Sequence, residues 1–258
     1  MNRRLALEGV ENFRDFGGYA TASGRRLKTG RLYRSASHGR ATDPDLEAIA
    51  ALDIAVVVDL RRTQERARDP SRRHHAFAAE VIDNDIGEEE DDSWIVHITS
   101  SDLSPASFRD YMLGYYAEVP AKPRMTDLYR RYFDVLARAD GPVLIHCAAG
   151  KDRTGILAAL THHLTGVGRD DLIADYLLTN DEERIARRLP QMIEYVREIS
   201  GRTPPEDAMR VGMGVDAAYL ETAFAAMTKH HGGIDAYLTT ALGVDADKRR
   251  RIVARLVE

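Results

Sequence analysis

The residues best suited to chemistry surround the single cysteine of the chain, where residues 146–155 read HCAAGKDRTG. The apolar run Val143 to Ile145 precedes this segment and predicts a buried strand, and residues 153–165 have the composition of a helix. A tight loop of small residues between a strand and a helix directs backbone N–H groups and a helix N-terminus at one concavity, which favours bound anions. The same environment favours Cys147 as a reactive thiolate.

Arg153 follows Cys147 by six positions, where the chain curls back. Its guanidinium can donate to two oxygens of one phosphate group. A nucleophile at the centre of such a cradle is what phosphoester transfer to an enzyme group requires. The alternative is a small buried cysteine beside an ordinary surface arginine. That alternative does not account for the joint spacing of His146, Gly150 and the Arg-Thr-Gly run at 153–155.

This loop resembles the HCxxGxxR[ST]G signature of the Cys-x5-Arg protein tyrosine phosphatase superfamily. The form with an internal Lys-Asp pair is similar to a bacterial branch that includes secreted mycobacterial and listerial phosphatases active on phosphotyrosine and phosphoinositides. Further segments extend the resemblance over most of the chain: NFRDFGGY at 12–19, GRLYRSA at 30–36, VVVDLRRTQER at 56–66 and DYLLTN at 175–180. The resemblance implies a tyrosine-phosphatase-like fold and a phosphatase that uses no metal and no other cofactor.

The resemblance also implies a two-step reaction. Cys147 attacks phosphorus and forms a phosphocysteine, which water then hydrolyses. Arg153 and the loop amides hold the phosphoryl oxygens. The expected substrate-binding residues are Ala148, Ala149, Gly150, Lys151 and Thr154. Thr154 is further expected to hydrogen-bond the sulfur, and His146 to fix the loop from beneath.

The departing oxygen needs a proton in the first step. The Trp-Pro-Asp motif of the larger tyrosine phosphatases is missing, because the only tryptophan, Trp94, is followed by Ile95. The resemblance implies that Asp152, inside the loop, is the general acid. In the alternative, Asp152 is a structural carboxylate that balances Lys151 and Arg153.

Two other aspartates are candidates for the acid. Asp59 and Asp85 lie near the ends of predicted strands, where α/β sheets build their sites. Asp59 also has a structural alternative, in which it anchors a turn together with Arg61 and Glu65. We therefore count Asp59 as a supporting residue of the site.

Three cations could add to the charge of the site. Lys151 would suit the several phosphates of an inositol headgroup, whereas in the alternative it is an ordinary solvated lysine. Arg14 and Arg34 lie in segments that resemble the bacterial branch and could face the pocket, or they could be ordinary surface arginines.

The elements that must position these residues alternate between strand and helix. Residues 54–60 (IAVVVDL) are continuous and β-branched, as in a strand buried on both faces. Weaker strands are predicted at 31–35 and 80–86, and the chain after Cys147 is helical, including a helical C-terminal part at 182–258. This pattern predicts a single α/β domain over residues 1–258, with a central, largely parallel sheet flanked by helices.

Residues 87–123 are long for a connection in a compact domain, and we expect a lid insertion there. Phe108, Tyr111, Met112 and Tyr115 form an apolar stripe at helical spacing that needs a partner surface. The stripe fits either a lid over the site or a part of the core. The acidic run Glu88 to Asp92 is expected to remain in solvent.

Composition narrows the classes of function. The chain has 258 residues, of which 44% are hydrophobic, and 41 acidic residues against 36 basic ones give a net charge of −5. This balance disfavours general nucleic-acid binding. One cysteine excludes an intramolecular disulfide. No apolar run approaches the roughly 20 residues that span a bilayer, and none has the length of a signal-peptide core, so we expect no stable membrane insertion and a cytoplasmic location, with export lacking a recognisable signal left open.

No metal site is predicted. His-Glu-x-x-His is absent, and the adjacent histidine pairs at 74–75, 162–163 and 230–231 would point about 100° apart on a helix. The expected partners are phosphorylated substrates, with no signal for a particular oligomeric state. The leading hypothesis is a phosphotyrosine phosphatase that also accepts phosphoserine or phosphothreonine. The alternatives are a phosphoinositide phosphatase on the same site, a non-catalytic phosphate-binding module and a sulfurtransferase.

Overall fold

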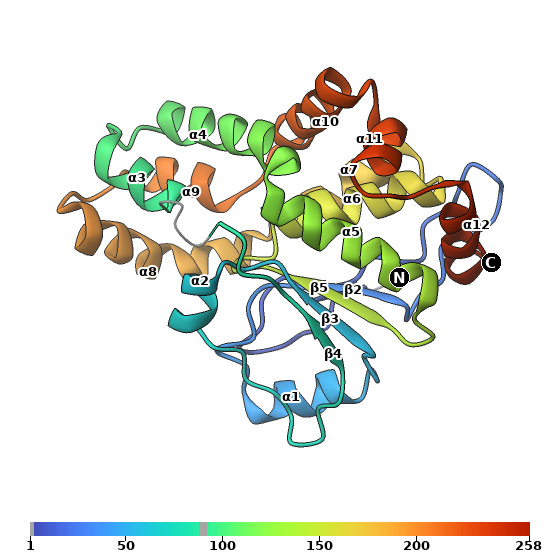
Figure 1. Cartoon of the computed structure of the whole chain (residues 1–258). Coiled ribbons are helices and arrows are strands. Elements are labelled where there is room, and N and C mark those ends of the chain that lie inside the picture. The colour runs from blue at the N-terminus through green and yellow to red at the C-terminus, as the bar shows by residue number, and fades with distance from the viewer. Residues whose placement is uncertain (1–2, 88–91) are drawn as a thin grey trace.

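A computed structural model describes residues 3–87 and 92–258 of the chain. Its centre is a five-stranded sheet with the strand order β1-β2-β5-β3-β4 (Figure 1). The strands are β1 (Arg14–Asp15), β2 (Leu32–Ser35), β3 (Val56–Asp59), β4 (Glu80–Ile82) and β5 (Val143–His146). Only β1 is antiparallel to its neighbour, which confirms the predicted α/β class with a largely parallel sheet.

Helices lie on both faces of this sheet (Figure 1). The helices are α1 (Asp43–Ala50), α2 (Thr63–Arg68), α3 (Ser93–Ser100), α4 (Pro105–Glu118), η1 (Val119–Ala121), α5 (Pro123–Arg138), α6 (Asp152–Thr165), α7 (Arg169–Leu177), α8 (Glu182–Ser200), α9 (Glu206–Met213), α10 (Ala217–His231), α11 (Ile234–Thr240) and α12 (Ala246–Leu256). In the described part of the chain, no helix is both long and apolar enough to cross a bilayer.

The two central strands, β3 and β5, are buried along their whole length. Side chains alternate between the faces of a strand, so the two faces of these strands contribute to different cores. Val57 and Leu144 pack with Leu46 of α1 on one face. Val56, Val58, Val143 and Ile145 face the main core, which includes residues of α5 and α6.

The register of the sheet brings three strand ends to one edge. Ser35 pairs with His146 across β2 and β5, and Asp59 pairs with His146 across β3 and β5. The loops that follow these parallel strands therefore leave the sheet side by side. Residues after β5 carry the cysteine, and residues after β3 begin the segment that leads into α2.

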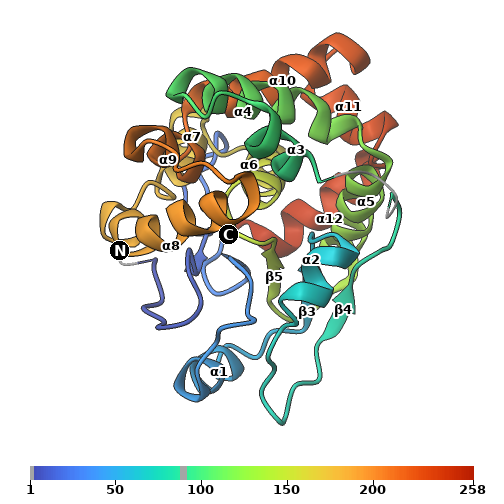
Figure 2. The same cartoon turned by 90° about the vertical axis from the view of Figure 1, so that its left-hand side faces the viewer.

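A second, smaller core lies beyond this edge. It joins α3, α4, α8 and α9, which lie together on one side of the molecule in both views (Figures 1 and 2). Its buried residues are Ile98, Leu103, Phe108, Ile185, Leu189, Val196, Ala208, Met209 and Met213.

The sequence did not predict α2 or α3. Helix α3 has several β-branched residues, and its N-cap is Asp92, whose side chain accepts a hydrogen bond from the Trp94 N–H. The predicted strand at 80–86 ends at Ile82, because Asn84 turns its side chain to Asp127 of α5 and leaves the sheet. Of the predicted acidic loop, residues 88–91 lie outside the described residues.

Candidate active site

The loop after β5 is shaped by hydrogen bonds to its carbonyl groups. The carbonyls of Ala148, Ala149 and Gly150 accept from the Ser37 N–H at 3.0 Å, the Asn12 side chain at 2.7 Å and the Arg34 guanidinium at 3.1 Å. In a trans peptide the N–H points opposite to the C=O. The next three N–H groups are therefore turned to the other side of the loop.

Gly150 is the residue that permits this turn. Its φ of +66° lies in the left-handed region, and a Cβ atom would sit 2.4 Å from the Ser35 carbonyl oxygen. Only glycine fits both restraints. The side chain of Cys147 is just before this turn and is buried, with 1% of its surface exposed.

The Arg153 guanidinium is held by a carboxylate from another helix. Its two terminal nitrogens donate to the two oxygens of Glu65 in α2, at 2.6 and 2.7 Å, and one of them also donates to the Leu60 carbonyl. Burial would raise the pKa of Glu65, but the Arg153 charge and hydrogen bonds hold it at about 2. Burial opposes the charge on Arg153, yet Glu65 raises the Arg153 pKa well above its usual value. The guanidinium is thus charged and fixed in orientation.

Asp152 begins α6 beside a second group of polar side chains. Its carboxylate accepts from the Tyr116 hydroxyl at 2.9 Å and lies 3.5 Å from the Lys151 ammonium. Lys151 is buried and donates to the carbonyls of Gly212 at 2.6 Å and Gly214 at 3.3 Å. The alternative of a solvated lysine is therefore wrong.

A cavity of about 800 Å³ opens above the loop. Ala148, Ala149, Lys151, Asp152 and Arg153 contribute to its lining, which places five of the predicted site residues around one space. Aromatic side chains from α3, α4 and α8 contribute to its walls: Trp94, Tyr111, Tyr115 and Tyr195. The arrangement can hold an anionic group at the loop and an apolar group beside it.

Comparison with known proteins agrees with this geometry. The sequence pattern of the tyrosine phosphatase family matches residues 5–258. The chain belongs to the tyrosine phosphatase family. It is a phosphatase, as the loop predicted.

Curated relatives match over most of their length. The chain is 33% identical to a Cupriavidus necator protein named as a candidate tyrosine-protein phosphatase, over 95% of this chain and 86% of that protein. It is 32% identical to the triple specificity protein phosphatase PtpB of Mycobacterium tuberculosis, over 91% and 92%. It is 29% identical to a tyrosine-protein phosphatase of Nostoc commune, over 86% and 73%.

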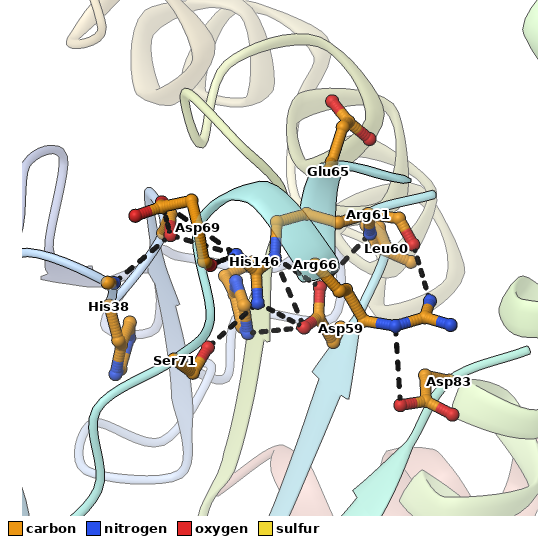
Figure 3. Close-up of polar contacts among 12 residues, drawn as sticks. His38, Asp59, Leu60, Arg61, Glu65, Arg66, Asp69, Ser71, Asp83 and His146 are labelled. Carbon is orange, nitrogen blue, oxygen red and sulfur yellow. Dashed lines mark hydrogen bonds and ion pairs between the residues drawn. The ribbon is translucent and has the colours of Figure 1, made fainter. Parts of the chain in front are cut away.

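His146 and Asp59 support the phosphatase loop from behind. The His146 ring is buried, with Nδ1 3.4 Å from the Cys147 carbonyl and Nε2 3.6 Å from the Asp59 carboxylate. Burial disfavours the charged ring and lowers the pKa of His146 to about 4. Arg61 holds Asp59 through its side chain and its N–H (Figure 3). Burial would raise the pKa of Asp59, but His146 and Arg61 lower it below its usual range, so Asp59 fits a supporting role better than that of an acid.

Asp85, Arg14 and Arg34 do not line the cavity of the phosphatase. Asp85 is exposed and pairs with Arg66 and Thr63, outside the lining of the cavity. Arg14 and Arg34 are fully buried and both pair with Asp175 of α7. The expectation that these arginines face the pocket or the surface is therefore wrong.

Thr154 is buried at the start of α6, and its hydroxyl has no hydrogen-bond partner among the described residues. The expected bond from this hydroxyl to the Cys147 sulfur is therefore not formed in this structure. Two partners in the site were not predicted from the sequence: Tyr116 beside Asp152, and Glu65 beside Arg153, since Glu65 was expected only as a turn partner of Asp59. The spacing of Glu65 from Arg62, whose N–H it caps at 2.7 Å as the third residue of α2, indicated the start of a helix but not the bond to Arg153.

The aromatic stripe of the expected lid is divided. Phe108 and Met112 are buried in the two cores, whereas Tyr111 and Tyr115 line the cavity of the phosphatase. Arg62 of α2 forms an ion pair with Asp92 at the start of α3. Segment 93–118 thus contributes both to the wall of the cavity and to the interior.

One histidine pair lies next to a carboxylate. Glu47, His74 and His75 have ligand atoms within 4.8 Å of one another, and these histidines are in a non-helical segment, so the argument from helical geometry does not apply to them. The His74 ring is already engaged, because Nδ1 accepts from the Ala76 N–H and Nε2 lies 3.1 Å from Glu47. A metal ion would have to displace these contacts.

Proposed function

We propose that this phosphatase hydrolyses phosphotyrosine through a phosphocysteine intermediate, with phosphoserine and phosphothreonine as further substrates. One observation carries the proposal: Arg153, fixed by Glu65, lines a single cavity together with Ala148, Ala149 and Lys151 of the loop that follows Cys147. A non-catalytic module would need the cradle but not the nucleophile.

The proposed reaction has two steps. The Cys147 thiolate forms the S–P bond while the P–O bond to the leaving group breaks, and Asp152 gives its proton to the departing oxygen. Water then forms a P–O bond as the S–P bond breaks, and the Asp152 carboxylate accepts a proton from that water. Arg153 and the loop N–H groups hold the three remaining oxygens throughout. The products are the free hydroxyl compound and inorganic phosphate.

The walls of the cavity support an aryl substrate. Tyr111, Tyr115 and Trp94 offer apolar faces against which a phenyl ring can pack. A cavity of about 800 Å³ accommodates a side chain together with flanking groups of a peptide.

A second candidate is hydrolysis of phosphoinositides at the same site. It is favoured by the cations that line the cavity beyond the loop, which are Arg40, Arg62, Arg68, Lys122, Arg124, Arg184, Arg187 and Arg188. Acidic residues share this lining, including Glu8, Glu11 and Asp69. An inositol ring with several phosphates could use the excess of positive charge.

Both candidates are tested by turnover of a phosphotyrosine peptide, a phosphoserine peptide and a panel of phosphoinositides, with a chelator present. Cys147→Ser should lower kcat roughly 1,000-fold or more on every substrate while the fold is kept, because the hydroxyl is a far weaker nucleophile. Rapid acid quench of the wild type should trap a phosphorylated protein that the variant does not form. Substantial turnover by pure Cys147→Ser protein would contradict the covalent mechanism.

A further inference from the structure

The carboxylate of Asp152 lies at the end of a chain of buried hydroxyl groups. The Tyr116 hydroxyl of α4 donates to Asp152 at 2.9 Å, and the Tyr176 hydroxyl of α7 lies 2.6 Å from that of Tyr116. An ionised carboxylate only accepts hydrogen bonds, so the Tyr116 hydrogen points to Asp152 and Tyr176 donates to Tyr116. Both tyrosines are almost completely buried, and water has no access to replace either donor.

The packing around Tyr116 and Tyr176 leaves space for their two rings beside α6. A Cβ atom on Gly155, one turn into α6, would lie 2.8 Å from the Tyr176 ring. The glycine therefore lets Tyr176 lie against the helix that carries Asp152. The rings of Tyr116 and Tyr176 meet edge to face, with centroids 6.3 Å apart.

The two phenols remain donors over the working pH range. Burial raises the pKa of Tyr116 and of Tyr176 well above the usual value, and the charge of Asp152 adds to this in both. The other titratable groups facing Asp152 are Tyr111 and Tyr115 of α4, Lys151 of the loop and Tyr219 of α10. Among the described residues, Tyr116 is the tyrosine that has a hydrogen bond to the carboxylate.

We propose that Tyr116 is a positioning residue for the general acid, with Tyr176 as its support. Tyr116 fixes the direction of the Asp152 carboxylate and stabilises its ionised form. It thereby holds the group that gives its proton to the leaving oxygen in the first step of the reaction. This inference rests on the proposed function, in which Asp152 protonates the leaving oxygen.

The test is the pH profile of kcat/KM for Tyr116→Phe, with one aryl phosphate that has a poor leaving group and one that is activated. Loss of the donor disfavours the carboxylate, so the alkaline limb should move up by roughly one pH unit. A less well-directed acid should lower kcat about 10-fold on the poor leaving group. The activated substrate should be hydrolysed at close to the wild-type rate.

Two further variants separate positioning from general packing. Tyr176→Phe should move the alkaline limb in the same direction by a smaller amount. Tyr132→Phe is the matched control, because its hydroxyl is equally buried but pairs with Thr161 at 2.9 Å. Its alkaline limb should stay at the wild-type pH. An upward move of the alkaline limb in folded Tyr116→Phe supports the proposal, and an unchanged limb or a downward move in that variant would overturn it.

Asp152→Asn distinguishes this failure from failure of the proposed function. If Asp152→Asn removes the alkaline limb and the leaving-group dependence while Tyr116→Phe changes neither, only the positioning role is overturned. If Asp152→Asn retains both, Asp152 is not the acid, and the role of Tyr116 is overturned with it. In the Asp152→Asn background, Tyr116→Phe should have no further effect on either property.

Discussion

The direction of Arg153 depends on Glu65, a residue on a different helix. Two parallel hydrogen bonds fix the plane of the guanidinium, and a third bond goes to the Leu60 carbonyl. Such a fork-to-fork pair restricts rotation as well as distance. The Arg153 guanidinium is therefore held in one orientation in the absence of a substrate.

Glu65→Gln should lower kcat/KM by about 10- to 100-fold, because one amide oxygen cannot accept both bonds and the guanidinium gains freedom. Steady-state kinetics on a phosphotyrosine peptide measures the effect. Glu194→Gln is the matched control, since Glu194 forms a comparable pair with Arg197 on the exposed side of α8. Equal kinetics for wild type and Glu65→Gln would show that Arg153 needs no partner.

Gly150 combines a left-handed backbone with a close approach of the loop to Ser35. Gly150→Ala should lower kcat at least about 100-fold, because the loop must shift to relieve the contact. Gly24→Ala is the control: its φ is also positive, at +77°, but a Cβ atom there would have nothing within 4 Å. It should cost only about 1 kcal/mol of stability and retain activity. If both variants were equally active, the tight contact at Gly150 would not shape the loop.

At the scale of elements, α4 connects the main core with the smaller one. Met112 and Tyr116 belong to the main core, Phe108 belongs to the smaller core, and Tyr111 and Tyr115 face the cavity. The helix therefore contacts Asp152 through Tyr116 and also contributes to the wall of the cavity. Replacing the whole of residues 87–123 would remove core residues. A point substitution in this segment changes its packing and leaves the rest of the core in place.

Phe108→Ala should lower the free energy of unfolding of the smaller core by about 3 kcal/mol, through lost burial and a cavity. Amide hydrogen exchange should become faster in α3, α8 and α9, with β3 and β5 still protected. This pattern would support a cover that opens separately from the sheet. Equal loss of protection in the sheet would show that both cores unfold together.

At the scale of the whole molecule, the interior contains several ionisable groups. His146 is neutral at pH 7 because burial lowers its pKa to about 4. Asp175 is ionised, because Arg14 and Arg34 overcome the effect of burial and hold its pKa at about 2. The folded state therefore requires that His146 is neutral and that Asp175 is ionised.

Acidification should destabilise the protein in two stages. Between about pH 6.5 and 4 the unfolded chain binds a proton at residue 146 that the folded chain does not, which removes up to about 3 kcal/mol. Below about pH 4, Asp175 and Glu65 lose their stabilising effect as pH falls toward 2. Urea unfolding at pH 8, 7, 6, 5 and 4 measures the first stage. A free energy of unfolding that is constant from pH 7 to 4.5 would contradict it.

The sequence by itself determined the strand–loop–helix unit around Cys147. The continuous apolar run, the glycine at the turn and the Arg-Thr-Gly spacing are local features, so each can be recognised in the sequence without knowing the rest of the fold. The same holds for the central strand β3, whose continuous run of β-branched residues predicts a strand buried on both faces. Family membership followed from these segments.

Only the tertiary structure decided which partners the charged and polar side chains take. Lys151 is bound to carbonyls of α9, Arg14 and Arg34 turn inward to Asp175, and Tyr116 reaches Asp152 from another helix. Residue type and spacing give the charge of a side chain but not the element that packs against it. In a parallel α/β fold, segments far apart in the chain meet at the ends of the strands. The partners that direct the chemistry are therefore set by the packing of these segments.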